Sequence, residues 1–217
     1  MNRIGHRLVT QIRARGDGGT VDIGFQGLSA AVERNEDFIW IVYDNEAYMN
    51  TGGQRSSATT KYAYTTTTPV GELSWGKPER KKNVPLLVAA HNVPYVATAS
   101  VSFPEGLIGK LRYAQELEGF RFIHISAPCP TGWGFNPMDT IKVGREMVLS
   151  GLWPLYEVVD GRTLRLTYKP RELKPVREVL KMQGRFRHVT DPEVEEIQGD
   201  VTDFWERLIL KDGGPLF

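Results

Sequence analysis

Apolar and polar residues alternate in blocks along the chain, and the length of each block separates strands from helices. Residues 38–43 form one unbroken apolar run, which is typical of a strand buried on both faces of a sheet. Leu107, Leu111 and Ala114 are instead spaced along one side of a helix. The same reasoning predicts strands at 38–43, 95–99, 120–125, 153–159 and 163–168, and helices at 22–34, 84–91, 104–117, 138–150, 175–182 and 192–210.

This alternation of strands and helices predicts an α/β fold with a mainly parallel sheet and helices on both faces. In the first helix we expect Ile23, Leu28, Ala31 and Val32 to share the buried face. Residues 51–78 are rich in Thr, Ser, Gly and Lys and predict a long loop region, which in a compact domain is usually functional or mobile.

The start of the chain does not resemble a central strand. Residues 8–15 are too polar to deliver a glycine-rich turn to a sheet edge in the usual way. We therefore expect residues 1–15 to be an irregular N-terminal remnant. Residues 16–217 would then form the folded domain, with a helical tail at the C-terminus.

Composition and charge exclude several classes of protein. Apolar residues make up 41% of the 217 residues and charged residues 24%, as in ordinary soluble domains. The net charge of +1 gives no strong field for nucleic acid or an anionic membrane. The most apolar stretch, residues 84–99, is too short and too interrupted to span a bilayer. A single cysteine excludes an internal disulfide framework and favours a reducing compartment, so we expect a cytoplasmic location.

The candidate chemistry lies between Gly16 and Gln54. Residues 16–19 read Gly-Asp-Gly-Gly before the first predicted helix, and glycines let the backbone approach phosphate oxygens closely. Asp17 would repel a diphosphate unless a hard divalent cation lay between them. Asn45 follows the first buried strand, 28 positions after Asp17, and the helix and strand between them return the chain to the same sheet edge. The pair therefore predicts a metal–diphosphate site.

A Gly-Asp-Gly followed at this distance by an asparagine is the fingerprint of proteins that bind thiamine diphosphate. Residues 44–59 read Asp-Asn-Glu-Ala-Tyr-Met-Asn-Thr-Gly-Gly-Gln-Arg-Ser-Ser-Ala-Thr, and this block closely resembles β subunits of the pyruvate:ferredoxin oxidoreductase family. Further matching blocks follow in the same order, at residues 65–69, 89–91, 94–100 and 127–133. The resemblance spans roughly residues 16 to 210 and implies a thiamine diphosphate-binding fold.

The resemblance also implies roles for individual residues. Mg²⁺ would be bound by Asp17, by the side chain of Asn45 and by the carbonyl of Ala47. Asn50 would lie near the reacting carbon of the cofactor and near the substrate, as the catalytic residue of this chain. The cofactor itself would be lined by Gly16, Asp17, Gly18, Gly19, Asn45, Glu46, Ala47, Tyr48, Met49 and Asn50.

The implied activity is the oxidative decarboxylation of pyruvate to acetyl-CoA and CO₂, with electrons passed through iron–sulfur clusters to ferredoxin, or the reverse. The implied partners are the other subunits of the enzyme (alpha, gamma and delta type), ferredoxin, pyruvate and coenzyme A. In the family, the glutamate that activates the aminopyrimidine ring is on another chain. Glu46 is therefore not assigned that role, and a partner chain would complete the active site.

Cys129 has two interpretations. A lone cysteine is usually a buried, small apolar side chain. The text around it instead resembles the segment that carries the last ligand of a [4Fe–4S] cluster, which needs four ligands. The family places the other cysteines upstream of Gly16, where this chain has none. We therefore expect an N-terminally truncated sequence, with Gly5-His6-Arg7 as a remnant, and a polypeptide that holds no cluster by itself.

For several other sequence features we prefer a structural interpretation to a functional one. The basic run at residues 77–82 predicts a solvated loop, and the alternative is a contact for acidic ferredoxin or for coenzyme A phosphates. His91 and His124 are expected to be packed rather than catalytic. Trp133 and Phe135 are expected to cover a buried loop. A polar loop is the default interpretation of Arg55 and the Ser/Thr run to Thr68.

Two alternative functions stay open. The first is another thiamine-dependent enzyme, such as an oxalate or branched-chain 2-oxoacid oxidoreductase, or a decarboxylase. The sequence Tyr-Met-Asn-Thr-Gly at residues 48–52 favours the pyruvate or oxalate type. The second is an inactive, truncated assembly subunit that binds metal–diphosphate or only its partner.

Overall fold

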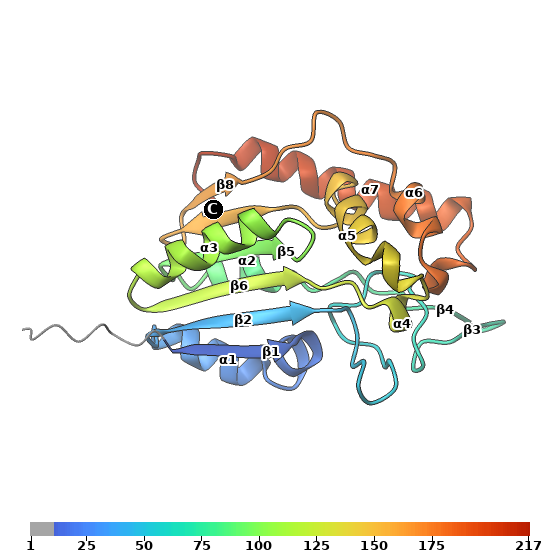
Figure 1. Ribbon diagram of the computed structural model, residues 1–217, viewed down its shortest axis with the longest axis horizontal. Helices are drawn as coiled ribbons and strands as arrows, with labels where there is room; N and C mark the ends of the chain where they lie inside the picture. The colour runs from blue at the N-terminus through green and yellow to red at the C-terminus, as the bar shows by residue number, and fades with distance from the viewer. Residues whose placement is uncertain (1–10) are drawn as a thin grey trace, which may run out of the picture.

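The computed structural model describes residues 11–217, which contain a six-stranded sheet with helices on both faces (Figure 1). In space the strand order is β1-β2-β6-β5-β7-β8. The first four are parallel, and the last two continue the sheet in antiparallel fashion, so the predicted, mainly parallel α/β fold is confirmed. The strands are β1 (Ile12–Gly16), β2 (Phe38–Asp44), β5 (Tyr95–Ser100), β6 (Phe120–Ser126), β7 (Tyr156–Val159) and β8 (Thr163–Leu166).

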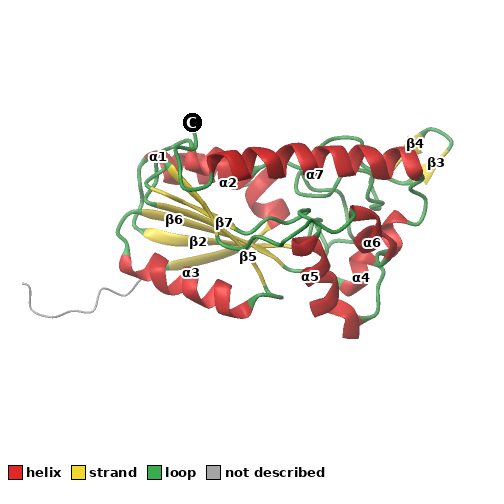
Figure 2. Cartoon of the chain, turned by 90° about the horizontal axis from the view of Figure 1, so that it is seen from above, coloured by secondary structure: helices red, strands yellow, loops and turns green. Residues whose placement is uncertain are grey.

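The helices form a layer on each side of the sheet (Figure 2). One face is covered by α1 (Phe25–Glu33), α2 (Val84–Ala89) and the long α7 (Asp191–Lys211), and the other face by α3 (Pro104–Glu116). The short helices α4 (Pro130–Trp133), α5 (Thr140–Leu149) and α6 (Val176–Lys181) lie beyond the carboxyl ends of the parallel strands. In residues 11–217, no helix combines the length and the apolar composition that a membrane span requires.

The register of the parallel strands places their carboxyl ends at one edge of the sheet. Asp44 at the end of β2 is level with Ser126 of β6, and Ser126 is level with Ser100 of β5. All residues of β5 and β6 are buried, which is the pattern expected for strands covered on both faces. The functional motif therefore starts from a rigid, buried edge of the kind at which α/β sheets bind ligands.

The chain turns into a helix directly after β1. Gly18–Asp22 form a single π-helical turn, in which the N–H of Ile23 donates to the carbonyl of Gly18, and α1 begins only at Phe25. Residues 17–22 are therefore helical, whereas the sequence predicts a helix only from residue 22. Leu28, Ala31 and Val32 are buried as predicted, but Ile23 is 83% exposed. The wider π turn rotates Ile23 away from the face that α1 presents to the sheet.

The ends of the predicted segments also differ in places. Ile12–Gly16 form a strand, so the expected irregular stretch does not extend to Arg15, although the domain boundary itself stays a prediction. Residues 1–10, which include Gly5-His6-Arg7, lie outside the described part of the chain. Residues 51–78 are largely irregular as predicted, with one small hairpin formed by β3 (Val70–Gly71) and β4 (Ser74–Trp75).

Candidate functional site

Asp17 and Asn45 meet at the carboxyl ends of the neighbouring parallel strands β1 and β2. One terminal atom of the Asn45 amide lies 2.9 Å from the carbonyl oxygen of Ala47 and 3.1 Å from Oδ1 of Asp17. With nitrogen in this position the amide donates a hydrogen bond to each oxygen. With oxygen in this position three oxygens converge on one point, and only a cation can hold them together.

The spacing of these atoms fits a small divalent cation. Mg²⁺ binds oxygens at about 2.0–2.1 Å in an octahedron, so adjacent ligands lie about 2.9 Å apart. The separations of 2.9 and 3.1 Å at Asn45 match that value. Asp17, Asn45 and Ala47 could therefore hold Mg²⁺ through three oxygens.

The environment of Asp17 also calls for a cation. Its side chain is only 1% exposed, and the hydroxyl of Ser56 donates a hydrogen bond to Oδ2. Burial, and then the nearby charge of Asp44, raise the pKa of Asp17 to about 8. Within residues 11–217 no lysine, arginine or histidine forms an ion pair with this carboxylate. A buried carboxylate must then bind either a proton or a metal ion.

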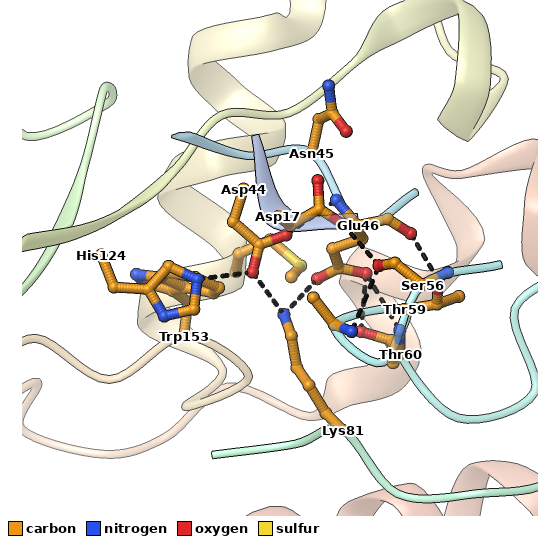
Figure 3. A network of polar contacts seen from close by, with 12 residues as sticks. Asp17, Asp44, Asn45, Glu46, Ser56, Thr59, Thr60, Lys81, His124 and Trp153 are labelled. Carbon is orange, nitrogen blue, oxygen red and sulfur yellow. Dashed lines mark hydrogen bonds and ion pairs between the residues drawn. The ribbon is translucent and has the colours of Figure 1, made fainter. Parts of the chain in front are cut away.

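The acidic neighbours of Asn45 are already paired (Figure 3). Asp44 lies 2.8 Å from Nε2 of His124 and 3.8 Å from Nζ of Lys81. Glu46 lies 2.8 Å from Nζ of Lys81 and 2.8 Å from Nη1 of Arg185. Burial alone would raise the pKa of Glu46, but Arg185 and Lys81 outweigh it and hold the pKa at about 2. Asp17 is thus the carboxylate of this group that has no cationic partner in the described chain.

Tyr48 connects the two halves of the motif. Its hydroxyl donates to the carbonyl of Gly18 over 2.9 Å, and its ring fills the space that a side chain at position 18 would need. Gly18 is therefore a glycine because Tyr48 packs against it. At Gly19, by contrast, an added Cβ would meet no atom within 4 Å. The open side of the π turn is at Gly19.

Residues of the motif and residues 129–133 together line a cavity of about 510 Å³. Its lining includes Glu46, Asn50, Cys129 and Arg185. Cys129 is half-buried, and its Sγ accepts the N–H of Gly132 over 3.4 Å, which caps α4. The structure thus brings the predicted Asn50 and Cys129 to the same cavity.

Cys129 alone does not fit the implied iron–sulfur cluster. It is the single cysteine of the sequence, and a [4Fe–4S] cluster needs four ligands. In the part of the chain that the structure describes, no group of three or more His, Cys, Asp or Glu side chains is placed to hold a metal ion. We therefore assign no step to a cluster held by this chain.

Trp133 covers a buried loop, as predicted. It is fully buried, and its indole N–H donates to the carbonyl of Asn45 over 2.8 Å. The guanidinium of Arg185 lies 3.9 Å from the centre of its ring. Trp133 thereby supports the backbone of the motif at Asn45.

The solvated-loop interpretation of residues 77–82 is wrong. Lys77 is fully buried and donates to the carbonyls of Glu79 and Arg80, while Lys81 turns inward to Asp44 and Glu46. The interpretation of the histidines is half right, because His124 is packed edge-on against Trp153 but His91 is exposed at the end of α2.

Several residues of the site were missed in the sequence. Ser56 and Thr59 are fully buried, although their segment predicts a polar loop. Thr59 donates to the backbone of Glu46 and Thr60 to its carboxylate. One signal was available: two acidic residues flank an asparagine inside an otherwise buried motif, and buried acids need cations. The missed residues are Asp44, Ser56, Thr59, Thr60, Lys81 and Arg185.

Comparison with known proteins places the chain in a family. Residues 4–125 match the family model of the thiamine pyrophosphate enzyme, C-terminal TPP binding domain. The pyruvate synthase subunit PorB of Methanocaldococcus jannaschii is 53% identical over 88% of this chain and 63% of its own length. The PorB subunit of Methanothermobacter marburgensis is 52% identical over 92% of this chain and 69% of its own length. The chain thus spans about two thirds of the length of these relatives.

Two further comparisons widen this picture. The ketoisovalerate oxidoreductase subunit VorB of Pyrococcus horikoshii is 47% identical over 89% of this chain and 62% of its own length. A solved 2-oxoglutarate:ferredoxin oxidoreductase from Magnetococcus marinus, with 2-oxoglutarate, coenzyme A and succinyl-CoA bound, has the same fold. Its TM-score is 0.53 at 24% identity, over 89% of this chain and 60% of that one. The chain belongs to the thiamine pyrophosphate enzyme family, in the group that contains the PorB subunits of pyruvate synthase.

Proposed function

We propose that this chain is the thiamine diphosphate-binding subunit of a pyruvate:ferredoxin oxidoreductase. The enzyme would convert pyruvate and coenzyme A to acetyl-CoA and CO₂ and pass electrons to ferredoxin, or run in the reverse direction. The observation that carries this proposal is the convergence of the Asp17, Asn45 and Ala47 oxygens beside the glycine turn. The names of the PorB relatives support pyruvate as the substrate.

In this proposal Asp17, Asn45 and Ala47 would bind Mg²⁺, whose charge would offset that of Asp17 and of the diphosphate. Gly19 leaves the start of the π turn open, so the diphosphate can approach the backbone and the positive end of the helical segment. Bound thiamine diphosphate supplies an electron sink for the loss of CO₂ from a 2-oxoacid. Asn50, at the wall of the 510 Å³ cavity, orients the substrate beside the cofactor. The remaining motif residues hold these groups in place.

The complete reaction would need groups from outside this chain. The relatives are subunits by name, and we propose that other subunits supply the glutamate that activates the cofactor and most of the electron path. Cys129 would join an iron–sulfur cluster only together with ligands from elsewhere. We expect ferredoxin and coenzyme A to bind the assembled enzyme, in the cytoplasm.

A second candidate is a branched-chain 2-oxoacid oxidoreductase, which the 47% identity to a VorB subunit favours. An oxalate enzyme and an inactive assembly subunit are the remaining alternatives. Turnover of the assembled enzyme with pyruvate, 2-oxoisovalerate and oxalate would rank the substrates. A higher kcat/KM for 2-oxoisovalerate than for pyruvate would replace the first candidate by the second.

Isothermal titration calorimetry with thiamine diphosphate tests the cofactor assignment. We expect binding that requires Mg²⁺ and is lost in EDTA. The titration is made with the chain alone and with the chain assembled with its partner subunits. Absence of binding in both preparations would sink the proposal and favour the assembly subunit.

A further inference from the structure

Glu46 has an unusual backbone conformation between two proposed metal ligands. Its φ is +64°, in the left-handed region that residues other than glycine rarely adopt. Asn45 precedes it and Ala47 follows it, so the turn at Glu46 sets the direction of both oxygens. Such a conformation persists only when its surroundings enforce it.

Every polar group of Glu46 has a partner. Its N–H donates to Oδ1 of Asp44 over 2.8 Å, and its carbonyl accepts the hydroxyl of Thr59 over 2.6 Å. One carboxylate oxygen, Oε2, accepts both the N–H and the hydroxyl of Thr60, at 3.2 and 2.8 Å. The side chain is 1% exposed, so these bonds form away from solvent. The carboxylate is thereby fixed in position as well as in charge.

Two cations approach this carboxylate from distant parts of the chain. Lys81 reaches Oε1 and Arg185 reaches Oε2, each over 2.8 Å. Both cations are also held by a tryptophan ring: Lys81 lies 4.4 Å from the centre of Trp153, and Arg185 lies 3.9 Å from the centre of Trp133. Figure 3 shows Lys81 between the carboxylates of Asp44 and Glu46. The pairs are therefore built into rigid surroundings, in contrast to surface ion pairs.

The charges balance in a way that isolates the metal site. Lys81 and Arg185 offset Asp44 and Glu46, and no cation of residues 11–217 pairs with Asp17. Asp44 and Glu46 are next to Asn45 in the sequence, and they would be strong oxygen ligands for a divalent cation if they were free. Pairing with lysine and arginine keeps both carboxylates away from the point where Asp17, Asn45 and Ala47 converge.

We infer that Lys81 and Arg185 clamp Glu46 and thereby hold the left-handed turn that directs the Asn45 amide and the Ala47 carbonyl at the metal. Glu46, Lys81 and Arg185 are positioning residues, and the cation contacts none of them. This inference rests on the proposed function. It adds residues that affect metal affinity by positioning the ligands rather than by contacting the metal.

Mn²⁺ serves as the probe, because its free form is measured directly by paramagnetic resonance. The wild-type chain, in the assembled enzyme if it requires its partners, is titrated with Mn²⁺ at saturating thiamine diphosphate. Lys81→Met is expected to weaken Mn²⁺ binding by about tenfold or more, since it releases one side of a strained turn. Lys81→Arg keeps the positive charge beside Glu46 and should weaken Mn²⁺ binding less than Lys81→Met does. The matched control is Lys169→Met, which breaks the ion pair to Asp212 after β8, at the opposite edge of the sheet from β1, and should change nothing.

Unchanged Mn²⁺ affinity in a folded Lys81→Met protein would overturn the clamp, because a purely structural lysine would lower the melting temperature without moving the metal affinity. If Lys81→Met does not fold, Glu46→Gln decides. The amide keeps the shape and the bonds to Thr60, and an affinity equal to wild type would again overturn the clamp. A wild-type enzyme that binds neither Mn²⁺ nor thiamine diphosphate would instead overturn the proposed function, and the clamp with it.

Discussion

Asp17→Asn should make the metal-free protein more stable at alkaline pH while it abolishes metal-dependent cofactor binding. Asparagine keeps the shape of the side chain and an oxygen for the hydroxyl of Ser56, but it carries no charge. The buried carboxylate has lost its solvation and faces Asp44, and its pKa is raised from 3.8 to about 8. Removing the charge removes that penalty.

The size of the effect follows from the two pKa values. Folded protein binds the proton on Asp17 more tightly than unfolded protein does, so this contribution to stability is complete below about pH 4 and is lost as the pH rises to 8. At about 1.4 kcal/mol per pH unit, the loss between pH 6 and pH 8 is about 2 kcal/mol. At pH 8 the total penalty is at most about 5 kcal/mol.

Urea unfolding in EDTA at about pH 6 and about pH 8 measures this difference. Wild type should lose about 2 kcal/mol more than Asp17→Asn between the two conditions. Asp203→Asn, at an exposed position of α7, is the matched control and should behave as wild type. Calorimetry with thiamine diphosphate and Mg²⁺ then checks the second half of the prediction, and Asp17→Ala should lose binding in the same way. Equal pH dependence in wild type and Asp17→Asn, or cofactor binding that survives either substitution, would refute the reasoning.

Three further predictions concern other parts of the site. Gly18→Ala should destabilise the chain by about 1–3 kcal/mol in urea unfolding, because the new methyl group overlaps the Tyr48 ring, whereas Gly19→Ala, where the space is open, should cost less than about 1 kcal/mol. Asn50→Ala should lower kcat of the assembled enzyme at least about tenfold and leave the Kd for thiamine diphosphate within about threefold, since Asn50 lines the cavity but is not one of the three proposed metal ligands. A Kd that rises as much as kcat falls would place Asn50 in cofactor binding instead. After iron–sulfur reconstitution the isolated chain should show no [4Fe–4S] signal by paramagnetic resonance, and an intact signal would show that Cys129 finds its other ligands without partner chains.

The parts of the fold that the sequence predicts are those in which local pattern and burial agree. The unbroken apolar run at residues 38–43 predicts a buried strand, and the structure forms β2 there. The alternation of strands with helices then limits the sheet to a mainly parallel one. Ile23 was misplaced because a helical period assumes α geometry, and the π turn at Gly18–Asp22 changes the period by one residue.

The proposed metal ligands can be named from the sequence because their chemistry is concentrated in two short segments. The residues that position these ligands could not be predicted. Lys81 and Arg185 are 35 and 139 positions from Glu46, and the side chains meet only in the folded chain. A lysine run has the same composition whether it faces solvent or a buried carboxylate. The choice depends on the path of residues 51–78, which carries little periodic pattern.

The position of β1 has a further consequence for the cofactor. β1 is at one edge of the six-stranded sheet, its residues are mostly exposed, and Asp17 directly follows its last residue. Strands at a sheet margin open at lower free energy than central strands, and native-state amide exchange records that opening residue by residue. Because opening of β1 would withdraw Asp17, each tenfold excess of cofactor over its Kd should add about 1.4 kcal/mol to the protection of the β1 amides that bond to β2. Exchange at this margin would therefore report occupancy of the site, while the amides shared by β5 and β6 would not.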